Sequence, residues 1–150
     1  MPLDEKILGF SNRWYAATME TALSLRLEPG LEIRLVTAPY FIATKLEAFK
    51  GRGNGDYSGS HDLEDLISVI DGRPTLANEI RKESIELRTY IAKEVKNLLQ
   101  APRFIDALPG HLLPDAASQA RMGVLVRRLE QLTEADKRLK VFRTDGPIKG

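Results

Sequence analysis

The sequence predicts a mainly α-helical domain with one or two short strands. Apolar residues recur at helical spacing along most of the 150 residues, whereas strict alternation is convincing only over residues 31–37. Hydrophobic residues make up 43% and charged residues 29%, which is the balance of a folded domain and not of a disordered chain. The net charge of +1 provides no overall field toward nucleic acid or an anionic membrane, so any such contact would be local.

The first part of the chain is predicted to hold one helix and one strand. Residues 11–27 have apolar residues along one face, with Ser11 or Asn12 as the N-cap and the pair Pro29-Gly30 after the end. Residues 31–37 alternate aliphatic and charged residues, which predicts a strand. A lone strand leaves backbone groups unpaired, so its partner would be a missing strand, the first residues of the chain or a second copy.

Four helices are predicted to follow. Pro39 suits the first turn of a helix over 39–50, and Ser60 suits the N-cap of the next helix. A long helix is predicted over 75–100 from its apolar stripe and its charges at helical spacing. Asp115 is predicted to cap a last helix over 116–132.

The composition also narrows the chemistry and the compartment. Cysteine is absent, which excludes disulfides, thiolate metal sites and cysteine nucleophiles. The N-terminus has neither the basic start nor the apolar run of a signal peptide, and no stretch approaches the ~18 apolar residues of a membrane span. We therefore expect a cytoplasmic protein with no membrane partner.

The residues that could carry chemistry bracket a loop rich in glycine. Lys45 lies on the helix before the loop, Arg52 lies within the loop, and His61, Asp62 and Asp65 follow it. Helical spacing lets Asp65 share a face with His61 or with Asp62. A pair of aspartates could bind a divalent metal or supply a general base, and the lysine ammonium could meet phosphate oxygens nearby. A capped helix start with a solvated charged face accounts for the same residues and stays open as the structural alternative.

Two other groups of residues have a structural and a functional interpretation. Trp14 and Tyr15 suit a core or an interface better than a platform for stacked bases. A basic region near the C-terminus, which includes Arg121, Arg127 and Arg128, suits a solvated helix face, with RNA contact as the alternative.

Residues 38–73 resemble the second half of bacterial nucleotidyltransferase-fold proteins of the AbiEii toxin-like group. In that pattern a Lys-Leu-x-Ala-x-x-x-Arg helix precedes a [Lys/His]-Asp-x-x-Asp-[Leu/Ile] helix. The residues that match the two elements are Lys45, Leu46, Ala48 and Arg52, then His61, Asp62, Asp65 and Leu66. The opening residues are also similar to the linker that follows the last catalytic strand in such proteins, so the resemblance covers about residues 1–100.

The resemblance implies transfer of a nucleotide from an NTP, with Mg²⁺ as the cofactor, to an RNA or protein hydroxyl. It implies nucleotide contacts for Lys45, Arg52 and His61, and catalytic roles for Asp62 and Asp65. It further implies that residues 1–38 are a linker helix and an orphan strand from a nucleotidyltransferase-like core. Residues 39–132 would then be a helical domain and residues 133–150 a tail.

The metal-binding motifs of that family are not present in this sequence. They comprise a Gly-Ser turn followed by Asp-x-Asp, and the one Gly-Ser here, Gly59-Ser60, precedes His-Asp-Leu-Glu-Asp instead. We therefore expect the C-terminal half of such a protein, catalytically weak or inactive alone. Three explanations stay open: a start codon assigned too late, a truncated gene, or a product that uses only the helical half. The alternative is a non-enzymatic helical interaction domain, which forms a homo-oligomer through its uncovered strand or binds another subunit.

Overall fold

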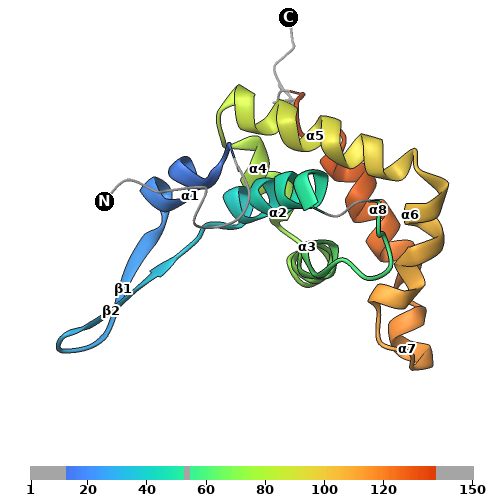
Figure 1. Cartoon of the computed structure of the whole chain (residues 1–150), viewed down its shortest axis with the longest axis horizontal. Helices are drawn as coiled ribbons and strands as arrows, with labels where there is room; N and C mark the ends of the chain where they lie inside the picture. Colours follow the sequence, from blue (N-terminus) through green and yellow to red (C-terminus); the bar gives the residue numbers. More distant parts are fainter. Residues whose placement is uncertain (1–12, 53–54, 138–150) are drawn as a thin grey trace, which may run out of the picture.

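Helices dominate the computed structural model, which describes residues 13–52 and 55–137 (Figure 1). The elements in chain order are α1 (Tyr15–Thr21), β1 (Leu23–Glu28), β2 (Leu31–Leu35), α2 (Ala38–Arg52), α3 (His61–Gly72), α4 (Leu76–Arg81), α5 (Ile85–Leu99), α6 (Pro102–Ala107), η1 (Leu108–His111), α7 (Ala116–Gln119) and α8 (Met122–Leu132). The predicted mainly helical class is confirmed. Within the described ranges, no helix has the length and apolar character required to span a membrane.

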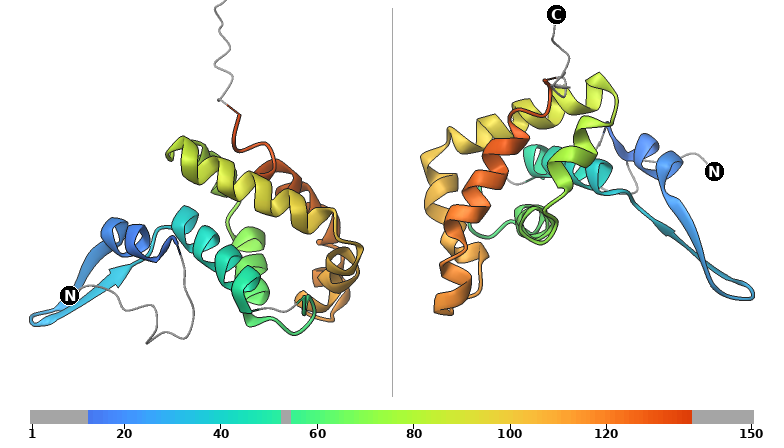
Figure 2. Two further views of the ribbon diagram at one scale, coloured as in Figure 1. Left: turned by 45° about the horizontal axis from the view of Figure 1, so that its top comes forward. Right: turned by 180° about the vertical axis from the view of Figure 1, so that it is seen from behind.

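The strand predicted over residues 31–37 is confirmed as β2, and its partner comes from this chain. β1 and β2 pair antiparallel as a hairpin, in a register that places Leu23 opposite Leu35. Gly30 at the connection has φ +81°, in the left-handed region that glycine adopts without strain. In all views the hairpin extends away from the helices (Figures 1 and 2).

The helix predicted over 11–27 is wrong beyond Thr21, because its second half is β1. Residues 23–28, Leu-Ser-Leu-Arg-Leu-Glu, alternate apolar and polar side chains as β2 does, and pairing with β2 satisfies their backbone groups. Ser11 and Asn12, the predicted N-caps, lie outside the described residues.

The long helix predicted over 75–100 is divided into α4 and α5. Ser84 starts α5, because its Oγ accepts a hydrogen bond from the backbone N–H of Leu87 at 3.3 Å.

The helix predicted over 116–132 is likewise divided, into α7 and α8. Asp115 caps α7 as predicted, accepting from the N–H of Ser118 at 3.0 Å. Arg121 lies at this second break and bonds Asp71 on α3.

The helix pair that holds the candidate residues matches the prediction closely. α2 includes the predicted 39–50 and continues to Arg52. α3 begins after Ser60, whose Oγ accepts from the N–H of Leu63 at 3.2 Å. The loop between the two helices returns the chain, so that α3 packs against α2.

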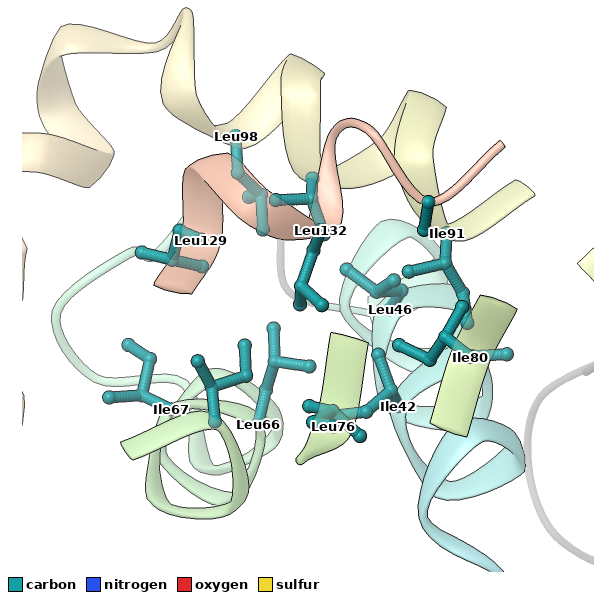
Figure 3. Packing of buried hydrophobic residues seen from close by; sticks show 14 of the residues in the cluster. Ile42, Leu46, Leu66, Ile67, Leu76, Ile80, Ile91, Leu98, Leu129 and Leu132 are labelled. Atoms are coloured by element: carbon teal, nitrogen blue, oxygen red, sulfur yellow. The ribbon is translucent and has the colours of Figure 1, made fainter. Parts of the chain in front are cut away.

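The apolar core lies between α2, α3, α4, α5 and α8 (Figure 3). Most of its members are buried aliphatic residues of these five helices, among them Ile42, Leu46, Leu66, Ile67, Leu76, Ile80, Ile91, Leu98, Leu129 and Leu132. Removing each such side chain from water stabilises the fold by ~1.5–3 kcal/mol. This core fixes α3 against α2 and thereby places the polar residues along their seam.

Candidate functional site

The candidate site is a cluster of one lysine and two aspartates on the seam between α2 and α3. The Nζ of Lys45 lies 2.8 Å from Oδ2 of Asp65 and 3.6 Å from Oδ1 of Asp62. Both aspartates lie on α3, and Asp62 is in its first turn, where the helix dipole favours negative charge. The structure therefore brings together three of the five residues that the sequence singled out.

The three side chains differ in their exposure to solvent. The exposed fraction is 8% for the Asp62 side chain, 22% for Lys45 and 47% for Asp65. The ammonium of Lys45 also lies 5.5 Å from the ring centroid of Phe41, one helical turn earlier in α2. Asp62 is thus the inner partner of Lys45, and Asp65 is the partner that water and solutes reach.

The charge of this cluster limits the ligands that it can take. One ammonium and two carboxylates sum to −1, so a phosphate would have to displace Asp65 from Lys45 to gain a favourable contact. Among the described residues there is no group of three histidine or carboxylate side chains placed to hold a metal ion. The Lys45 ammonium already occupies the place between the two carboxylates. The Mg²⁺ that the resemblance implies therefore does not fit this cluster.

The other two candidate residues are not part of the cluster. His61 points into solvent with a side chain 92% exposed, and its Nδ1 lies 3.0 Å from Oε1 of Glu64. Arg52 ends α2, and its side chain lies outside the part of the chain that the structure describes. A nucleotide contact by either residue stays a prediction.

The contact between His61 and Glu64 predicts a titration that NMR can follow. The hydrogen bond to Glu64 raises the pKa of His61 above its ordinary 6.5, and its charge together with those of Asp65 and Asp62 adds to the effect. This stabilising contribution is present below pH ~6.5 and is lost as the pH rises through the folded-state pKa. Glu64→Gln should return the pKa toward 6.5, and Asp65→Asn should lower it less. A His61 pKa at or below 6.5 in the unsubstituted chain would contradict the pairing.

Sequence reasoning missed Phe41 as a neighbour of the cluster. Phe41 is half-buried, and its ring lies beside the ammonium of Lys45. The signal that could have found it is the i, i+4 spacing of the two residues on one helix face.

A second polar cluster joins α2 to α5 on another side of α2. The hydroxyl of Tyr90 donates to the carboxylate of Glu47, and Lys50 lies 3.1 Å from Glu94. Burial and the bond to Glu47 raise the pKa of Tyr90, so the phenol stays protonated. The partners are more than forty residues apart in sequence (separations of 43 and 44), so helical spacing could not reveal them. We assign this cluster to structural support between the two helices.

Two arginines of the basic region have structural partners at the end of α3. Arg121 Nη2 lies 2.9 Å from Oδ1 of Asp71, and Arg128 donates to the backbone carbonyl of the same residue. Cations at a helix C-terminus are favoured by the exposed carbonyls and the helix dipole. This arrangement supports the structural interpretation of Arg121 and Arg128 over RNA contact.

Comparison with known proteins adds no assignment: no protein-family model, no curated protein and no solved structure matches this chain. The AbiEii-like resemblance accordingly stays a prediction. What the chain does has to be argued from the Lys45–Asp62–Asp65 cluster itself.

Proposed function

We propose that this chain is the nucleotide-binding half of a nucleotidyltransferase-like protein, in which Lys45 binds a phosphate. The supporting observation is the meeting of Lys45, Asp62 and Asp65 at one point between two helices. These are three positions of the AbiEii-like pattern. A loop separates Lys45 from the two aspartates, so helical spacing alone does not bring them together. Phosphoryl transfer depends mainly on positioning and on charge neutralisation, which a fixed ammonium can provide.

The three residues have different roles in this proposal. Asp62 is nearly buried and stays with Lys45, so it fixes the ammonium in place. Asp65 is half-exposed and gives up its contact when a phosphate oxygen of the NTP binds Lys45. Either aspartate can then orient or deprotonate the hydroxyl of an RNA or protein acceptor. Arg52 balances the charge of the two aspartates, as the resemblance implies.

The net charge of −1 makes this a weak phosphate site. Because the two carboxylates oppose an incoming phosphate, and because Mg²⁺ does not fit the cluster, we assign no step to the metal. The family's metal-binding motifs are also not among these 150 residues. We accordingly expect weak nucleotide binding and little or no catalysis from this chain alone.

Calorimetry tests the proposal with inorganic triphosphate and with each NTP in Mg²⁺ buffer. We expect weak binding by the intact chain and none by Lys45→Met, which removes the charge but keeps the length of the side chain. Asp65→Asn should bind more tightly by ~2- to 5-fold, because it removes an exposed competitor whose ion pair is worth ~0.2–1 kcal/mol.

Lys82→Met is the matched control, since Lys82 is an exposed lysine at the C-terminal end of α4. It should bind as the unsubstituted chain does. Binding that survives Lys45→Met would remove Lys45 from the proposal. Absence of binding in both the intact chain and Asp65→Asn would remove the nucleotide site altogether.

A further inference from the structure

The β1–β2 hairpin stands apart from the helical core. It extends away from the helices in every view, and neither strand packs extensively on a helix (Figures 1 and 2). The described part of the chain contributes two strands to this sheet, so the outer edge of each has no neighbouring strand there. Two-stranded hairpins without further support are marginally stable in water, which makes this one an incomplete sheet.

Large apolar residues are exposed where the hairpin meets the helices. The exposed fraction is 62% for Leu23, 45% for Leu35 and 39% for Val36. In the backbone register of the hairpin, Leu23 lies opposite Leu35. Scattered exposed leucines are common on protein surfaces, but a contiguous group beside an open sheet edge indicates an interaction surface.

A groove of about 580 Å³ lies at this end of the hairpin, and its lining is mainly apolar but includes the ion pair of Arg73 with Glu79. Phe41 of α2 and Val69 of α3 line it together with the exposed residues of the hairpin. Thr37 also lines it, and its Oγ1 is buried without a hydrogen-bond partner in the described residues. A buried hydroxyl without a partner costs ~1–3 kcal/mol, and a backbone group of a docked chain could satisfy it.

A second copy of this chain does not fit this surface. Antiparallel pairing of two hairpin edges about a two-fold axis keeps both apolar faces on one side of the joined sheet and leaves both uncovered. Face-to-face stacking covers them, but two strands of this length span ~20 Å by ~10 Å, or ~200 Å² per copy. The resulting ~400 Å² is far below the ~1,200 Å² that stable interfaces bury, and the edges would stay unpaired.

We infer that the hairpin edge and the groove bind an extended segment of a partner polypeptide, which adds a strand to the sheet. Its backbone pairs with the free edge, and its alternate side chains, which are aliphatic, enter the groove beside Leu35 and Phe41. This arrangement satisfies the edge and the apolar surface together, which neither arrangement of a second copy does.

The test uses a synthetic strand peptide that alternates valine with threonine and ends in lysines for solubility. Hydrogen exchange of the intact chain, with and without the peptide, reports on the amides of residues 23–36. We expect the peptide to slow their exchange, and the same peptide with a central proline to have no effect, since proline cannot donate to a ladder. Leu35→Lys should weaken binding by ~10-fold or more.

Leu113→Lys is the matched control, because Leu113 is 70% exposed on the loop before α7, away from the hairpin. It should leave peptide binding unchanged. The inference is overturned if neither peptide protects the hairpin, if both protect it equally, or if Leu35→Lys binds as well as Leu113→Lys. Light scattering that finds a dimer, dissociated by Leu35→Lys, would assign the surface to a second copy instead.

Discussion

Replacement of Lys45 by methionine should destabilise the fold by ~2–4 kcal/mol. Methionine keeps the length and the apolar stem of the side chain, so the loss measures the missing charge. Asp62, whose side chain is 8% exposed, would lose its contact with the Lys45 ammonium, and breaking a buried pair by removing one partner costs ~3–5 kcal/mol. The value expected here is somewhat lower because Lys45 is itself 22% exposed. Urea denaturation at neutral pH measures the difference in the free energy of unfolding.

Asp62, and not the closer Asp65, should account for most of this effect. The two contact distances of 2.8 Å and 3.6 Å differ by a factor of ~1.3, whereas the effective dielectric differs by ~4 between a surface site and bulk water. The difference in burial of the two aspartates therefore affects their interaction energies with Lys45 more than the difference in distance does. Asp65→Asn, at a side chain 47% exposed, should cost no more than ~1 kcal/mol.

A double-mutant cycle of Lys45→Met with Asp62→Asn separates this pair from other contacts of the two residues. We expect a coupling energy of ~1–3 kcal/mol, whereas groups that do not interact give additive costs within ~0.5 kcal/mol. Additive costs would show that Lys45 and Asp62 do not stabilise each other.

The cycle also bears on nucleotide binding, because a Lys45 variant that loses stability can lose binding indirectly. Asp65→Asn, which should barely affect stability, is therefore the more direct test of the phosphate site.

The geometry of the cluster could be predicted in part from local rules. The N-cap at Ser60 fixes where α3 begins, and the spacing of Asp62 and Asp65 then places both on one face. Whether Lys45 reaches that face depends on how the intervening loop turns. The sequence allowed this approach but did not require it. The difference in burial between the two aspartates depends on packing by distant helices and has no local signal.

His61 shows where helical spacing leaves a choice open. Asp65 is four residues after it and Glu64 three, and both spacings bring side chains together on a helix. The structure has the contact with Glu64, and the imidazole is exposed to solvent. The sequence could not choose between the two carboxylates.

The hairpin was not predicted because the local propensity of residues 23–28 favours a helix, whereas their pairing with β2 makes them a strand. Leucine, arginine and glutamate are good helix formers, so this segment reads as the continuation of a helix. Its strand state depends on the ladder with β2, a contact that forms only once the chain has turned at Gly30. The break at Ser84 was missed for a different reason, since an N-cap serine is a local signal that the long apolar stripe concealed.

Leu66→Ala should destabilise the protein by ~3–4 kcal/mol, within the range for leucine in a close-packed core. Leu66 is fully buried on α3 and packs in the core with residues of the other helices (Figure 3). Leu113→Ala provides the matched comparison, because the same atoms are removed from a side chain that is 70% exposed. Its cost should stay within ~0.5 kcal/mol. Equal urea midpoints for the two variants would contradict the burial of Leu66.

The same substitution should also loosen the candidate site, because one face of α3 packs in the core and the adjoining face carries the aspartates of the site. One face anchors the helix in the core through Leu66, and the adjoining one holds Asp62 and Asp65 against Lys45. Weakening the anchor lowers the free energy of opening for α3, so its amides should exchange faster in Leu66→Ala, and triphosphate binding should fall with them. Loss of stability without faster exchange in α3 would show that the cluster is positioned by α2 and the loop. Faster exchange with unchanged binding would show that a rigid α3 is not required for binding.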